Sequence, residues 1–135
     1  MAATGEKFKL GEGFALPDGQ GLAIFRAMSD AVLLVFSTCP DDGSAERLAE
    51  QLVQQGLAAC VNIGPPVISV YRWKDNIERA TERPIALKTT AAAYPALEQA
   101  LRTRHPYEVP EIIAVPVNCG LPAYLEWVKE CTKHA

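Results

Sequence analysis

His105 is the residue whose type and position are best suited to binding chemistry. A neutral imidazole binds Cu(II), Ni(II) and Zn(II), and Pro106 restricts the backbone at His105. The other histidine, His134, lies next to the C-terminus. We therefore predict that His105 is a metal ligand. One histidine does not hold a metal tightly, so a second interpretation stays open, in which His105 ends a helix and bonds to carbonyl groups or faces solvent.

Cys39 is the second candidate ligand, because it lies where a predicted strand gives way to a predicted helix. The positive end of a helix dipole lowers the pKa of a nearby thiol, and a thiolate binds soft metals and is easily oxidised. A small packing role is the alternative. The remaining cysteines, Cys60, Cys119 and Cys131, form no CxxC pair or zinc-finger spacing. We expect reduced thiols, with Cys60 and Cys131 in the core and Cys119 exposed.

The sequence lacks the signatures of common catalytic sites. It contains no GxSxG, HExxH, P-loop or GxGxxG motif. A Cys39–His105 nucleophile pair can be formulated, but no oxyanion-hole signature accompanies it. Residues 38–42 are acidic, whereas a small hydrolase of the acylphosphatase type needs a glycine-rich loop with an arginine there. We therefore predict a binding protein and not an enzyme.

Composition limits the classes of partner. The 135 residues fit one domain, with 49% hydrophobic and 21% charged residues and a net charge of −3. Nucleic-acid binders present a basic face, and the sequence has no cluster of lysine and arginine. No apolar run approaches the ~18 residues of a membrane span. We therefore expect neither nucleic acid nor a membrane as partner, and without a recognisable export signal we expect a cytoplasmic protein.

The segment 1–27 differs from the rest of the chain. It contains five glycines, and its apolar residues follow no period. We predict a flexible N-terminal extension over 1–27 and one folded domain over 28–135. One hypothesis makes Met28 the natural start and the upstream segment dispensable, and a natural flexible arm is the alternative.

Apolar residues in the folded domain alternate between strand and helix patterns. Ala45, Leu48 and Leu52 recur with helical spacing, and Gly56 is suited to end that helix. Lys74-Asp75-Asn76 is typical of a turn between two strands. The sequence predicts strands at 31–38, 57–63, 67–73, 78–90 and 112–117, and helices at 45–56, from Pro95 up to His105, and from Pro122 onward.

With 57–63 and 67–73 counted as one strand interrupted at Gly64-Pro65-Pro66, the order of these elements is β-α-β-β-α-β followed by a helix. It predicts an α+β domain of the ferredoxin-like, split βαβ class, with one sheet and helices on one face. Pro84 and Pro116 fall inside strands, so each places its part of the strand at an edge or a bulge. Exposed sheet edges need cover, and self-association is one way to supply it.

Six short segments extend over nearly all of the predicted domain. They are Ser37–Asp41 (STCPD), Leu57–Ile63 (LAACVNI), Ser69–Trp73 (SVYRW), Leu87–Thr90 (LKTT), His105–Glu111 (HPYEVPE) and Tyr124–Trp127 (YLEW). With these segments in this order, the chain resembles the CutA divalent-cation tolerance family. The resemblance implies a ferredoxin-like subunit in a tight homotrimer. It also implies a link to tolerance of divalent cations, notably copper.

The resemblance further implies a ligand cleft between subunits. Glu82, Lys88, Tyr107 and Glu111 match family positions that gather around that cleft, and Trp73 is expected beside it. Carboxylates there could complete a cation site, or could form an interface ion pair with the lysine. The aromatic side chain is expected to serve mainly in packing between subunits.

The chain departs from the bacterial copper pattern of this family at two positions. That pattern has two adjacent histidines before Pro-Tyr, and here Arg104 replaces the first of them. Its cysteine position falls at Ser37, two residues before Cys39. The prediction is a divalent metal ion, Cu(II), held by His105 and Cys39. The alternative is a PII-like sensor that binds a small anionic metabolite between subunits through Lys88 and Arg104.

Overall fold

The structure is a computed structural model and describes residues 31–133. The predicted extension over 1–27 and the proposed start at Met28 lie outside the described residues. No helix in the described part of the chain is long and apolar enough to cross a membrane. The elements are β1 (Val32–Pro40), α2 (Ser44–Gln54), β2 (Cys60–Ile63), β3 (Val67–Trp73), β4 (Asn76–Thr90), α3 (Tyr94–Arg104), β5 (Ile113–Pro116) and α4 (Pro122–Thr132).

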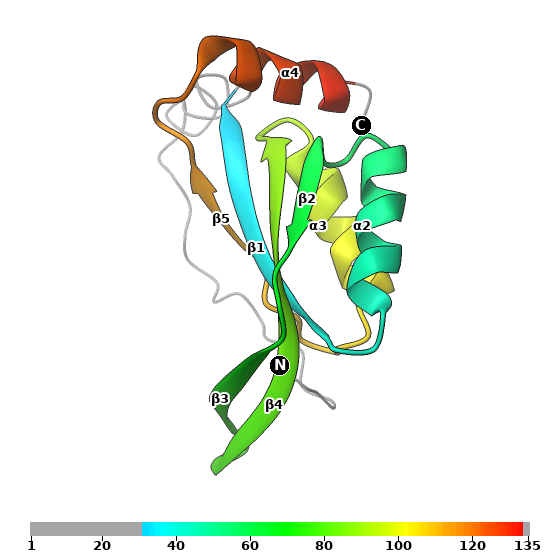
Figure 1. The fold of residues 1–135 in the computed structure, drawn as a ribbon, viewed down its shortest axis with the longest axis vertical. Coiled ribbons are helices and arrows are strands. Elements are labelled where there is room, and N and C mark those ends of the chain that lie inside the picture. The colour runs from blue at the N-terminus through cyan, green and yellow to red at the C-terminus, as the bar shows by residue number, and fades with distance from the viewer. Residues whose placement is uncertain (1–30, 134–135) are drawn as a thin grey trace, which may run out of the picture.

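All strands belong to one antiparallel sheet. Its order is β2-β4-β1-β5, and β3 pairs with the outer half of β4. The pairing of β1 with β4 runs from Val32 opposite Thr90 to Pro40 opposite Glu82. Helices α2 and α3 cover one face of the sheet, and α4 lies across one end (Figure 1). If β2 and β3 are taken as two halves of one interrupted strand, this is the predicted element order in a mixed α/β domain.

The hydrophobic core lies between the sheet and helices α2 and α3. Side chains alternate along β1 and β4, so every second residue points toward the helices. Fully buried residues include Val35 of β1 and Leu87 of β4, packed with Leu52 of α2 and Leu101 of α3. The helical spacing in α2 supplies one apolar stripe to this layer, as predicted.

Both helices end where the sequence predicts. Gly56 has φ +69°, and the amide that follows it, on Leu57, bonds back to Leu52 O at 3.0 Å. This is the left-handed turn that glycine permits after a helix. Helix α3 ends at His105, whose extended conformation (ψ 137°) is the one that a residue before proline prefers.

Of the two alternatives predicted for Pro84, the strand edge is wrong, whereas the bulge agrees with the register, because residues 64–66 between β2 and β3 lie opposite only Arg83 and Pro84. β4 is an interior strand, and Pro84 is paired with Thr38 of β1. Its carbonyl accepts the Gly64 N–H at 2.8 Å, on the side where β2 ends and β3 has not begun. The proline nitrogen, which cannot donate, therefore faces the interruption in the neighbouring strand. A Cβ at Gly64 would lie 2.8 Å from Pro84 Cγ, so this close approach requires glycine. The prediction for Pro116 is confirmed, because β5 is an edge strand.

The opposite face of the sheet is left open by the helices of residues 31–133 except at one end, where Val32 packs with Val128 of α4 and Thr90 Oγ1 lies 3.4 Å from Thr132 Oγ1 (Figure 1). We call it the open face, and it carries Leu34, Phe36, Ile113 and Val115 from β1 and β5. Ile113 is 55% exposed and Val115 is 45% exposed. The β3–β4 hairpin extends beyond the sheet at the end opposite α4 (Figure 1). Its exposed apolar residues are Val67, Ile68, Val70 and Ile77, and the last three lie on the face of β4 opposite to that of Glu82 and Lys88.

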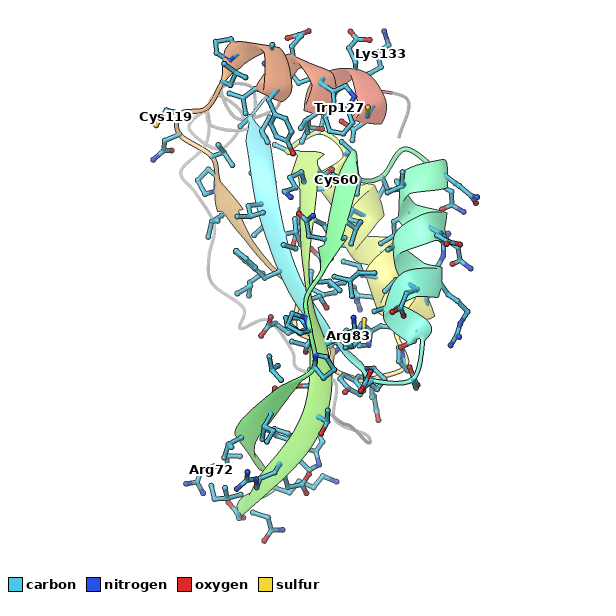
Figure 2. All side chains as sticks on the ribbon, viewed as in Figure 1. Cys60, Arg72, Arg83, Cys119, Trp127 and Lys133 are labelled. Carbon is cyan, nitrogen blue, oxygen red and sulfur yellow. The ribbon has the colours of Figure 1, made fainter. Side chains whose placement is uncertain are left out.

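Two of the predictions for cysteines need correction. Cys131 lies on α4 and is exposed, and Cys60 on β2 is half-buried, so neither belongs to the core as predicted. Cys119 is exposed, as predicted, and lies on the connection between β5 and α4 (Figure 2). All four cysteines are free thiols.

Candidate functional site

Three segments that are distant in sequence meet at the base of the hairpin. They are the C-terminal end of β1, the residues that follow α3, and the part of β4 around Glu82. Register places Pro40 opposite Glu82, and His105 bonds to Thr38 although 67 residues separate them. Two predicted ligands, Cys39 and His105, and two predicted cleft residues, Glu82 and Tyr107, are therefore neighbours in the fold.

His105 has hydrogen bonds at both of its ring nitrogens. Nε2 lies 2.7 Å from the Thr38 carbonyl oxygen, and Nδ1 accepts the backbone N–H of Tyr107 at 3.0 Å. Because Nδ1 accepts, the proton belongs on Nε2, which donates to the carbonyl. The side chain is buried, and burial lowers its pKa. A neutral imidazole at the end of a helix, bonded to a carbonyl, is the second of the two interpretations predicted for it.

Cys39 is fully buried, with Sγ 3.8 Å from His105 Nε2. Burial raises the pKa of its thiol to about 11, and the negative charges of Asp42, Glu82 and Glu46 act in the same direction. The predicted lowering by the dipole of α2 is therefore wrong in sign. Cys39 is a protonated thiol within the core cluster, which corresponds to the packing alternative.

Glu82 is a buried carboxylate, 1% exposed, at the base of the hairpin. Hydrogen bonding with the side chains of Ser69 and Tyr107, and to a smaller extent of Thr38, lowers its pKa. Burial raises its pKa, but these hydrogen bonds outweigh burial and the net shift is downward. The same arrangement raises the pKa of the Tyr107 hydroxyl, first through burial and then through the carboxylate. The site therefore holds a buried anion stabilised by hydroxyl donors.

The other predicted cleft residues lie elsewhere in the subunit. Lys88 is on the open face, where Nζ donates to Asn62 Oδ1 and lies 3.9 Å from Cys60 Sγ. Trp73 is at the tip of the hairpin, with Lys74 Nζ 6.0 Å from its ring centroid. Glu111 lies half-buried in the connection before β5. The single chain therefore brings together two of the five predicted cleft residues and separates the other three.

Sequence reasoning missed the groups that bind these side chains. Thr38 contributes its main-chain carbonyl, which no sequence pattern reveals. Ser69 could have been found, because the two-residue turn at Lys74 and Asp75 fixes the hairpin register. That register sets Val67 opposite Glu82 and makes Ser69 its diagonal neighbour on the same face.

The residues of one subunit do not fit a resident metal ion. Both nitrogens of His105 are engaged, and Cys39 is protonated and buried. Within residues 31–133, no group of three or more histidine, cysteine, aspartate or glutamate side chains is placed to hold a metal. An apolar groove of about 340 Å³ lies between α2 and β2, lined by Ala49, Glu50, Val53, Gln54 and Val61. It contains none of the predicted site residues.

Comparison with known proteins relates this fold to one family. The family described as "CutA1 divalent ion tolerance protein" matches residues 33–131, which include every element except the first residue of β1 and the last residue of α4. The chain belongs to the CutA1 family. The CutA protein of Mus musculus is 44% identical over 103 residues, covering 76% of this chain and 58% of the mouse protein. The chain therefore spans about three-fifths of that relative's length.

Bacterial CutA proteins match over nearly their full length. The divalent-cation tolerance protein CutA of Thermus thermophilus is 41% identical over 105 residues, covering 78% of this chain and 99% of the relative. The crystal structure of CutA from Xylella fastidiosa superposes with a TM-score of 0.74 at 46% identity, covering 76% of this chain and 98% of that one. The CutA fold therefore accounts for the described domain, and the resemblance found in the sequence is confirmed.

Proposed function

We propose that this CutA-family chain acts in divalent-cation tolerance as a homotrimer of ferredoxin-like subunits. The observation that carries the proposal is the open face of the sheet, defined above by Leu34, Phe36, Ile113 and Val115, together with the apolar hairpin. Exposed apolar areas of this kind mark protein–protein interfaces. A second and third copy of the chain are the partners that would cover it.

The two edges of the sheet support self-association in the same way. β5 ends one side of the sheet, and β2 ends the other. Each is a four-residue strand that has no partner strand on its outer side within residues 31–133. Unpaired backbone groups at sheet edges favour addition of a strand from another chain. A closed ring of copies would use these edges and the open face together.

Divalent cations are the proposed ligand of the assembled protein, and Cu(II) is the ion that we propose. His105 and Cys39, the two predicted ligands, already have structural roles in the folded subunit. A metal at His105 would have to displace either the Tyr107 N–H or the Thr38 carbonyl. We therefore propose that the donors are carboxylates and other exposed groups which assembly brings together, so that Cu(II) binds between subunits.

The anionic-metabolite sensor has no comparable support. Its two proposed cations lie on opposite sides of the sheet within one subunit. Lys88 projects from the open face toward Asn62, whereas Arg104 donates to Gln55 Oε1 at 2.8 Å on the helix-covered side. The geometry of one chain therefore favours no shared anion site between them.

A calorimetric Cu(II) titration at a concentration that maintains the assembly tests the metal proposal. We expect saturable binding by the wild type that is retained in His105→Asn, because an amide oxygen can replace Nδ1 as acceptor for the Tyr107 N–H. Loss of binding in this variant at unchanged oligomeric state would assign the ligand role to His105 instead. Absence of saturable Cu(II) binding by the wild-type assembly would contradict the proposal.

A further inference from the structure

The β3–β4 hairpin forms an arm, residues 67–82, that extends beyond the helix-covered sheet (Figure 1). Within the described residues, β3 has no paired strand besides β4. A two-stranded ribbon has little stability of its own and twists readily. The contacts at its base therefore decide the direction in which the arm projects.

Two consecutive residues anchor the base of the arm from opposite faces of β4. On the helix-covered side, Arg83 donates through Nε to Gly64 O at 2.7 Å and lies 3.6 Å from Asp41 and 3.8 Å from Glu46 (Figure 2). These carboxylates are exposed, so each ion pair contributes little. On the other side, Glu82 is buried and its hydrogen bonds are shielded from water.

We propose that Glu82 and Tyr107 are positioning residues that fix the direction of the arm and thereby permit assembly. The geometry is a series of neighbouring groups from the arm to the body of the protein. Ser69, the diagonal neighbour of Glu82 in the hairpin register, and Tyr107, in the connection after α3, are the side chains whose hydrogen bonding contributes most to lowering the pKa of the buried carboxylate. The backbone N–H of Tyr107 is held by His105 Nδ1, and His105 Nε2 is held by the Thr38 carbonyl of β1.

The chemistry of this series explains why a carboxylate occupies the base of the arm. A carboxylate is an acceptor only, with room for several donors, so it can bind hydroxyls from two segments at once. Bonds to an ionised acceptor are about twice as strong as bonds between neutral groups. Because the carboxylate is buried, the loss of a donor would leave a buried charge with fewer hydrogen bonds, which is costly in free energy. The arm cannot swing away without breaking this arrangement.

The link from arm direction to assembly rests on the proposed homotrimer. The apolar arm residues Ile68, Val70 and Ile77 are exposed in one subunit and would contact another copy. Shape complementarity at an interface fails if a projecting element is displaced by even small distances. The direction of the arm itself does not depend on the trimer, and it can be measured separately.

The test compares Tyr107→Phe with Tyr94→Phe. Each variant removes one half-buried tyrosine hydroxyl that bonds to a carboxylate, but Tyr94 bonds to Glu98 within α3 and touches no part of the arm. Hydrogen–deuterium exchange is followed by mass spectrometry at residues 67–82 and over α2 and α3. Sedimentation equilibrium measures the association constant of the same samples.

We expect Tyr107→Phe to accelerate exchange in 67–82, with α2 and α3 unchanged, and to weaken association about tenfold. Tyr94→Phe should change neither quantity. Glu82→Gln, which keeps the side-chain shape but not the charge, should accelerate exchange in the arm as well. Unchanged exchange in 67–82, or acceleration spread equally over the helices, would overturn the positioning role. A wild type that stays monomeric would overturn the proposed trimer, while the exchange data would still decide whether Glu82 and Tyr107 hold the arm.

Discussion

The two faces of the sheet carry similar apolar side chains but bury them to different extents. On the helix-covered face, Val35 and Leu87 are fully buried by α2 and α3 of the same chain. On the open face, Ile113 and Val115 are about half exposed, and no helix of residues 31–133 covers strand β5 on that face. One face is covered by helices of the same chain, whereas the other leaves apolar side chains exposed. In the proposed trimer, the first face would supply the stability of the subunit and the second its contacts with other copies.

A leucine on each face makes this comparison measurable. Leu87→Ala removes a fully buried side chain and should lower the free energy of unfolding by about 2–5 kcal/mol. Leu34→Ala, on the open face, should cost less than Leu87→Ala in a monomer and should instead weaken association. Denaturant unfolding at several protein concentrations separates the two effects. Equal, concentration-independent losses in both variants would show that the open face needs no partner.

A charge introduced on each side of the sheet in turn should give an even larger difference in the association constant. Val115→Asp puts a carboxylate on the open face and should weaken association about 100-fold, or by about 2.7 kcal/mol. Val53→Asp is the matched control, because Val53 is 42% exposed on α2 against 45% for Val115. Sedimentation equilibrium of both variants gives the constants. Similar association of Val115→Asp and the wild type would remove the open face from the interface.

As the pH falls below 7, the first loss in the free energy of unfolding should come from the base of the arm. Burial lowers the pKa of His105, so the unfolded chain takes up a proton on this imidazole below about pH 6.5 and the folded chain resists it. Stability should therefore fall as the pH drops from 7 toward 5, by at most about 1.4 kcal/mol per pH unit. His105→Asn should abolish this slope. Glu82 adds a further loss below the ordinary glutamate pKa, because its folded pKa is lowered. A wild-type stability that does not change between pH 7 and 5 would contradict the buried neutral imidazole.

The smallest expected effect lies at the tip of the arm. Lys74 and Asp75 both have positive φ, 47° and 66°, in the two-residue turn that joins β3 to β4. Glycine adopts this conformation at no steric cost, so Asp75→Gly should stabilise the fold by about 0.5–1 kcal/mol. Thermal unfolding measures the gain. A loss of stability would show that the aspartate makes a contact at the tip which outweighs its strain.

The helix ends and the hairpin turn could be predicted from residue types and spacing, because their determinants are local. Gly56 ended α2 and the proline after His105 ended α3, as the sequence predicted. The turn at Lys74 and Asp75 likewise predicted the hairpin. For Pro84 the sequence left an edge and a bulge open, because the choice depends on the interruption at Gly64 in another strand, which only the assembled sheet shows.

The chemistry of the site was less predictable, because burial decides it. Cys39 follows a strand and precedes a helix, and that position predicted a lowered pKa, yet full burial and nearby carboxylates raise it. His105 was predicted as a ligand from its type, whereas its availability depends on main-chain groups of Thr38 and Tyr107. Glu82 was expected at a cleft and is instead 1% exposed. Contacts across the sheet, and not residue spacing, set these outcomes.

The mass of the intact protein in solution tests the central claim most directly. Native mass spectrometry of the wild type and of Val115→Asp, at equal concentration and neutral pH, reports the number of chains in each assembly. The account predicts three chains for the wild type and a shift toward single chains for the variant, because the open face then carries a charge. A wild type that remains a single chain at the highest concentration measured would contradict the claim that copies of this chain cover the open face.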